Sequence, residues 1–74
     1  MTKKDIKTIE EMVLDERKYG YIFCDFDDYR HDLMEIADAI GIEMIQNEDE
    51  EWVFKTEKQK QRVEEALQYY YDLH

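Results

Sequence analysis

Apolar residues recur at the three- and four-residue spacing of a helix face in three parts of the chain. The pattern predicts a first helix over residues 3–18 and a second that begins at Asp27 or Asp28 and stops at Gly41. A third helix is predicted to follow the N-cap residue Thr56. The inward positions expected for the three helices are Ile6, Ile9, Met12 and Val13; Tyr29, Leu33, Ile36, Ala37 and Ile40; and Val63, Ala66, Leu67, Tyr70 and Leu73.

Shorter apolar segments between these helices are typical of strands. Residues 42–45 and 52–54 flank the polar run 46–51, which predicts two short strands joined by a wide hairpin loop. The aromatic and β-branched segment 21–26 is too short for a helix and favours a brief strand or an extended connection. We therefore expect one compact α+β domain over the whole chain (residues 1–74), with three helices and a β-hairpin between the second and third.

The size of the chain favours binding over catalysis. A chain of 74 residues has room for one small core, which leaves little structure to support a catalytic pocket. No apolar run approaches the roughly 20 residues that span a bilayer, and the N-terminal residues lack the apolar stretch of a secretion signal, so we expect a soluble cytoplasmic protein. Cys24 is the single cysteine, which excludes an internal disulfide.

The segment CDFDDYRHD, residues 24–32, is the obvious candidate for chemistry because it concentrates four aspartates, a histidine and a cysteine. Over residues 22–28, the apolar segment that ends in Asp25-Phe26-Asp27 resembles the first motif of haloacid-dehalogenase-type phosphatases, in which the first aspartate attacks phosphate and the second handles the proton. The resemblance breaks down at Tyr29, and that family needs a much larger Rossmann-like domain. A calcium loop starting at Asp25 would need glycine and glutamate where the chain has Arg30 and Ile36.

A metal site is the remaining chemical interpretation of this segment. His31 could bind zinc or manganese together with Asp27, Asp28 or Asp32. Only Asp27 and His31 share a helix face, however, and His74 is the only other imidazole. A solvated, capped helix start accounts for the same residues, so we predict no catalytic residue, no metal and no cofactor, and the chain is expected not to be an enzyme.

The charge of the chain is concentrated in its middle third. Residues 1–24 hold five acids and five bases, and residues 52–74 hold four of each. Residues 25–51 hold eleven acids against Arg30 alone, so this tract supplies the entire net charge of -10. A well-mixed surface would avoid the repulsion among these groups, which indicates that their concentration has a use.

On the second helix, Asp28, Asp32 and Glu35 are spaced to form an acidic stripe, which we expect to be exposed. Their spacing along the axis, about 6 and 10 Å, is similar in scale to the repeat of phosphates in nucleic acid. The sequence thus predicts an acidic inhibitor that occupies the nucleic-acid-binding surface of a basic, nuclease-like protein. Direct binding to nucleic acid or to a membrane is not expected. The carboxylates expected to contact the partner are Asp25, Asp27, Asp28, Asp32, Glu35, Asp38, Glu48, Asp49, Glu50 and Glu51.

In size, acidity and tyrosine content, the whole chain resembles small phage-encoded proteins that block host defence nucleases, including anti-CRISPR proteins and other DNA mimics. This resemblance is one of character and carries no diagnostic motif. It implies a nucleic-acid-binding host enzyme as the partner, with the carboxylates of residues 25–51 in the place of phosphates.

Aromatic residues support an alternative function. In the run Tyr69-Tyr70-Tyr71, only Tyr70 lies centrally on the inward face, and Tyr69 and Tyr71 either rim the core or contact a partner. Trp52 and Phe54 are expected in the core under the hairpin. The alternative is a homo-oligomeric or adaptor protein, including an antitoxin or a homodimer, that binds through an aromatic surface.

Overall fold

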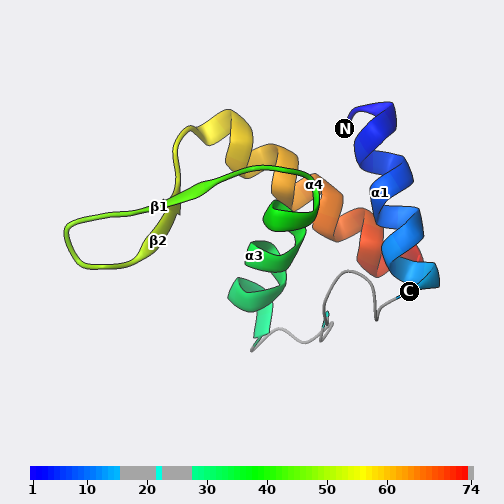
Figure 1. Cartoon of the computed structure of the whole chain (residues 1–74), viewed down its shortest axis with the longest axis horizontal. Helices are drawn as coiled ribbons and strands as arrows, with labels where there is room; N and C mark the ends of the chain where they lie inside the picture. Colours follow the sequence, from blue (N-terminus) through cyan, green and yellow to red (C-terminus); the bar gives the residue numbers. More distant parts are fainter. Residues whose placement is uncertain (16–21, 23–27, 74) are drawn as a thin grey trace.

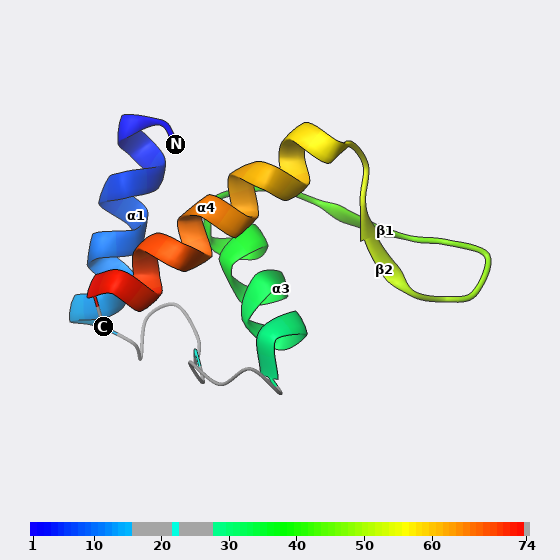
Figure 2. The ribbon, with the colours of Figure 1, turned by 180° about the vertical axis from the view of Figure 1, so that it is seen from behind.

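The computed structural model of the chain describes residues 1–15, Ile22 and residues 28–73. This part contains the helices α1 (Lys3–Leu14), α3 (Tyr29–Ala39) and α4 (Glu57–Leu73), and an antiparallel hairpin of β1 (Met44–Gln46) and β2 (Trp52–Phe54). α1 and α3 both pack against α4, and the hairpin extends away from the helices on the side opposite α1 (Figures 1 and 2). The predicted α+β order, with the hairpin between the second and third helices, is confirmed.

Helix α1 begins after Thr2, whose hydroxyl accepts a hydrogen bond from the backbone N–H of Asp5 at 3.1 Å. This bond satisfies one of the amide groups that a helix start leaves without a partner. Asp5, Ile9 and Met12 are buried, so a carboxylate occupies the first position of the inward face. The helix ends at Leu14 and not at residue 18 as predicted. The predicted strand over residues 21–26 lies outside the described residues, except for buried Ile22.

The end of helix α3 is fixed by backbone geometry at Gly41. Gly41 has φ +78°, a left-handed conformation that glycine adopts without a steric penalty. Its N–H bonds to the carbonyl of Asp38, and the N–H of Ile42 bonds to the carbonyl of Ala37, which is a Schellman motif. The predicted stop at Gly41 is thus confirmed. At the other end Asp28 occupies the N-cap position as predicted, but its side chain makes no capping bond, and Asp27 lies outside the described residues.

The hairpin pairs Met44 with Phe54 and Gln46 with Trp52, which places these four side chains on one face. Met44 and Phe54 pack against the core, whereas Trp52, one pair further out, is 44% exposed. The expectation that Trp52 lies in the core is therefore wrong, because the outer part of the two-stranded hairpin extends away from the helices (Figure 1). Phe54 lies where it was expected.

Helix α4 supplies the centre of the core. Thr56 caps it as predicted, accepting a bond from the backbone N–H of Gln59 at 3.2 Å. Four of the five predicted inward residues are fully buried, and Leu73, in the last turn, is the exception at 43% exposed. The buried core comprises Ile9, Met12, Ile22, Ile36, Ala37, Ile42, Val63, Ala66, Leu67 and Tyr70.

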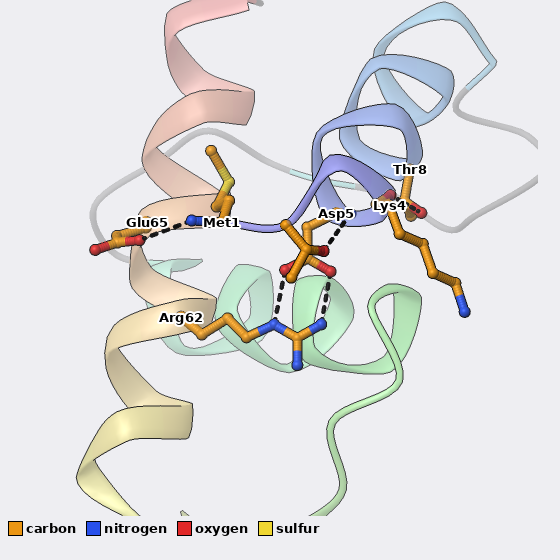
Figure 3. Close-up of polar contacts among 7 residues, drawn as sticks. Met1, Lys4, Asp5, Thr8, Arg62 and Glu65 are labelled. Atoms are coloured by element: carbon orange, nitrogen blue, oxygen red, sulfur yellow. Dashed lines mark hydrogen bonds and ion pairs between the residues drawn. The ribbon is translucent and has the colours of Figure 1, made fainter.

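A partly buried ion pair joins α1 to α4 (Figure 3). Arg62 donates from Nε to Oδ2 of Asp5 and from Nη2 to Oδ1, both at 2.7 Å. The Asp5 side chain is 1% exposed and that of Arg62 is 38% exposed. The hydrogen bonds from Arg62 hold the pKa of Asp5 below its ordinary value, even though burial acts in the opposite direction.

Substituting Asn for Asp5 should lower the free energy of unfolding at pH 7 by about 1–3 kcal/mol, because it weakens a charge-assisted bidentate contact and leaves Arg62 without its counterion. Because the folded pKa of Asp5 is lowered, the stability from its ionised form is present in full above about pH 4, the ordinary aspartate value, and is lost as the pH falls through the folded pKa. The difference between wild type and variant should thus be constant from pH 7 to about pH 5 and shrink below pH 4.

Urea denaturation measured across this pH range checks the prediction. Asp49→Asn makes the same chemical change at an exposed position of the hairpin and is the matched control. Its unfolding free energy should stay within about 0.5 kcal/mol of wild type. An equal loss in the two variants would contradict a special role for the buried pair.

Candidate protein-binding surface

The loop between the strands presents four consecutive carboxylates, Glu48 to Glu51, all of them exposed. We call these residues the acidic tip. The loop is held by Asn47, whose side-chain oxygen accepts bonds from the N–H groups of Asp49 (2.9 Å) and Glu51 (3.0 Å). The backbone of Asn47 adds bonds to Glu50 and Glu51, so the tip has a defined conformation although its side chains face solvent.

Two ion pairs connect the hairpin to neighbouring residues. Arg30 of α3 lies 3.5 Å from the carboxylate of Glu51 and also from the carbonyl of Trp52, so it ties the start of β2 to α3. Lys55 lies 3.6 Å from Glu43 across the base of the hairpin. Both pairs are solvent-exposed and so contribute at most about 1 kcal/mol each.

The predicted acidic stripe on α3 is wrong in its central member. Asp32 is fully buried, because it lies four residues before Ile36 and therefore shares the inward face with it. Its Oδ2 accepts a 2.7 Å hydrogen bond from the hydroxyl of Tyr71. Asp28 and Glu35 are partly exposed, and Asp38 is exposed. Asp25 and Asp27 lie outside the described residues.

The tyrosines predicted to rim the core or contact a partner do lie at the edges of the α4 face, and both are partly buried. Each is engaged within the chain: Tyr71 donates to Asp32, and Tyr69 donates to Glu10 of α1 at 3.0 Å. This bond to the Glu10 carboxylate raises the pKa of the Tyr69 hydroxyl. The two tyrosines thus connect α4 to the helices on either side of it.

An exposed apolar surface that the sequence analysis missed lies where the hairpin meets α3. Two grooves adjoin there and share Met44 and Trp52 in their linings. The first, which we call the acidic groove, has a volume of about 520 Å³ and is lined by Met34, Ala37, Asp38, Gly41, Ile42, Glu43, Met44 and Trp52.

The second, the basic groove, has a volume of about 360 Å³. Its charged lining residues are Arg30, Lys55, Glu57 and Lys60, so bases outnumber acids there. The sequence pattern could not identify either groove, because residues from α3, the hairpin and, for the basic groove, the start of α4 come together only after folding.

Of the candidate segment CDFDDYRHD, residues 24–32, the structure describes residues 28–32. His31 is exposed and its Nε2 lies 4.0 Å from Glu35, one turn further along α3. Over residues 1–15, 22 and 28–73, no three histidine, cysteine, aspartate or glutamate side chains form a group that could hold a metal ion. In the same residues, no helix combines the length and the apolar character needed to cross a membrane.

Two matched substitutions test the internal role of the tyrosines. Tyr71→Phe should lower the free energy of unfolding by about 1–3 kcal/mol, because it removes a donor from a fully buried carboxylate. Tyr69→Phe makes the same change at a bond in an exposed setting and should lower the free energy of unfolding by less than Tyr71→Phe does. Urea denaturation at pH 7 measures both, and a larger loss for Tyr69→Phe would contradict this assignment.

Comparisons with protein-family models, with characterised proteins and with solved structures found no match to this chain.

Proposed function

We propose that the chain is a non-enzymatic binding protein that docks its acidic hairpin on the nucleic-acid-binding surface of a basic partner and thereby inhibits it. The observation that carries the proposal is the acidic tip: four exposed carboxylates at the end of a hairpin that extends away from the helical body (Figure 1). A projecting, acidic element of this kind fits a channel built to hold a phosphate backbone.

Electrostatics supports the same proposal at longer range. The net charge of -10 attracts a basic partner before contact and speeds association, most strongly at low salt. Because Asp32 is buried, the contribution of α3 to the contact surface is limited to Asp28, Glu35 and Asp38. The proposed contact is therefore centred on the hairpin and extends from it to α3.

The backbone at Glu50 is a further argument that the tip is used. Glu50 has φ 62°, a left-handed conformation that favours glycine or asparagine and costs a glutamate on the order of 1 kcal/mol. A loop required only for the turn would be more stable with glycine at this position. A glutamate at position 50 is explained if its carboxylate contacts the basic partner.

The proposal assigns the chain to the cytoplasm, where proteins that handle nucleic acid are accessible to it. It is in keeping with the resemblance in character to phage-encoded inhibitors of host defence nucleases. Catalysis forms no part of it, because the exposed tip offers no enclosed space in which substrate could be shielded from water.

A homo-oligomeric, adaptor or antitoxin-type protein is the second candidate, and the exposure of Trp52 and Met34 is the observation that favours it. Since Tyr69 and Tyr71 are engaged within the chain, its aromatic contact would be made by Trp52. Light scattering separates the two candidates: self-association that is insensitive to salt would favour the second.

Affinity purification from the organism that encodes the chain tests the first candidate. The expected partner binds nucleic acid, duplex DNA or RNA should compete with the chain for it, and its Kd should rise steeply with salt. The tip variant Glu48→Gln/Asp49→Asn/Glu50→Gln should bind about tenfold more weakly, since three contact charges at about 0.5 kcal/mol each amount to roughly that factor.

The control variant Glu57→Gln/Glu65→Gln/Asp72→Asn removes the same number and kinds of exposed charge from α4. It should retain most of the affinity, because its charges lie away from the tip. Equal losses of affinity in the two triple variants would mean that only non-specific electrostatic attraction holds the partner. Full affinity of the tip variant would refute the proposal.

The strained residue provides an independent prediction. Glu50→Gly should leave the unfolding free energy unchanged or raise it by up to about 1 kcal/mol, because glycine adopts the left-handed conformation freely, and should weaken partner binding at the same time. Glu48→Gly removes the same charge at a position where φ is not positive and should not gain stability. Thermal melting and titration with the purified partner measure the two effects; unchanged binding by Glu50→Gly would contradict a role for this carboxylate.

A further inference from the structure

We infer that the acidic groove between α3 and the hairpin seats an apolar side chain of a basic partner segment, with Asp38 and Glu43 pairing with lysines or arginines on either side of it. The inference rests on the proposed function, because it takes the partner to be basic. Under this inference, charge alone does not determine which partner segment binds. The segment must present an apolar residue with a lysine or arginine on either side of it.

The size and lining of the acidic groove suit such an anchor. Its volume of about 520 Å³ lies within the range of about 300–1,000 Å³ found for ligand-binding clefts. Its apolar surface comes from Met34, Ile42, Met44 and Trp52. Apolar walls with a few polar groups at the edge are the usual composition of a site that binds an amphipathic segment.

Two of these lining side chains are exposed without a role in the core. Trp52 is 44% exposed and Met34 is 36% exposed, whereas Met44 and Ile42 extend into the core. Tryptophan is strongly enriched among residues that dominate binding energy, and methionine adapts its shape to varied partners. The exposure of both at one groove is explained if a partner covers them.

The charges around the two grooves indicate which segment enters. Asp38 and Glu43 are exposed at the acidic groove, and among the described residues no base lines it. On the other side of Trp52, the basic groove has Arg30, Lys55 and Lys60. A lysine- or arginine-bearing segment is therefore attracted to the first groove and repelled from the second.

The acidic groove needs little rearrangement to accept a partner. Glu43 pairs with exposed Lys55 at 3.6 Å, a weak contact that a partner's base can replace. Gly41, which lines the groove, lies in the Schellman motif, and a Cβ built there would meet nothing within 4 Å. The groove beside Gly41 is thus open, and its backbone is already fixed.

Trp52 is the only tryptophan of the chain and lines both grooves, so its fluorescence reports on binding at either, and the groove variants below tell them apart. Three synthetic peptides of equal length serve as probes. The Leu/Lys peptide carries leucine on one helix face and lysine on the opposite face. The Ser/Lys peptide replaces each leucine by serine, and the Leu/Glu peptide replaces each lysine by glutamate. The Leu/Lys peptide should shift Trp52 emission and bind about tenfold or more tightly than the Ser/Lys peptide, because burial of one leucine is worth roughly that factor. The Leu/Glu peptide should not bind.

Matched variants locate the contact. Met34→Ser and, separately, Asp38→Asn should each weaken binding of the Leu/Lys peptide several-fold. Leu73→Ser changes another exposed apolar residue, and Lys60→Gln changes a charge at the basic groove, and neither should weaken it. Circular dichroism checks whether each variant is folded. If Met34→Ser does not fold, the exposed substitution Asp38→Asn still tests the contact.

The outcomes distinguish this inference from the proposed function. Equal affinity for the Leu/Lys and Ser/Lys peptides would overturn the groove as a site while leaving an acidic binding protein. Binding of the Leu/Glu peptide as tightly as the Leu/Lys peptide would overturn the selection by charge. Failure of both lysine peptides to bind at low salt would overturn the inference and count against the proposed function as well.

Discussion

The structure depends on two buried aspartates that α4 holds from different sides. Asp5 of α1 accepts two hydrogen bonds from Arg62, and Asp32 of α3 accepts one from Tyr71. A buried carboxylate is costly unless it is paired, so each of these contacts strongly favours one placement of its helix on α4. Apolar burial supplies the driving force for packing, and the two polar contacts make it specific.

This arrangement divides the acidic residues between two roles. The carboxylates inside the protein are structural, and each has a partner on α4. Those of the hairpin tip contribute to no core contact, and their mutual repulsion is tolerated because the hairpin extends into solvent. The hairpin thus presents an exposed tryptophan beside four exposed carboxylates.

Much of the fold could be predicted from the sequence, because the signals are local. Helical spacing, the cap at Thr56 and the glycine at position 41 each act within a few residues of the element they define. Asp32 differs from its prediction because the polarity of an aspartate predicts exposure, whereas its four-residue spacing from Ile36 places it on the inward face. The pairing of Asp5 with Arg62 could not be predicted, since 57 positions separate them and several other bases were available. The grooves at Trp52 are likewise a product of the assembled fold.

The order of the elements along the chain has a consequence for synthesis. α4 supplies four core residues and both of the groups that hold the buried aspartates, yet it is the last described element to leave the ribosome. Until it emerges, α1 and α3 lack the helix against which they pack, and their apolar faces remain exposed to solvent and to chaperones. Packing of α1 and α3 therefore cannot be completed before α4 has left the ribosome, and a chain that ends before residue 57 lacks the helix against which both of them pack.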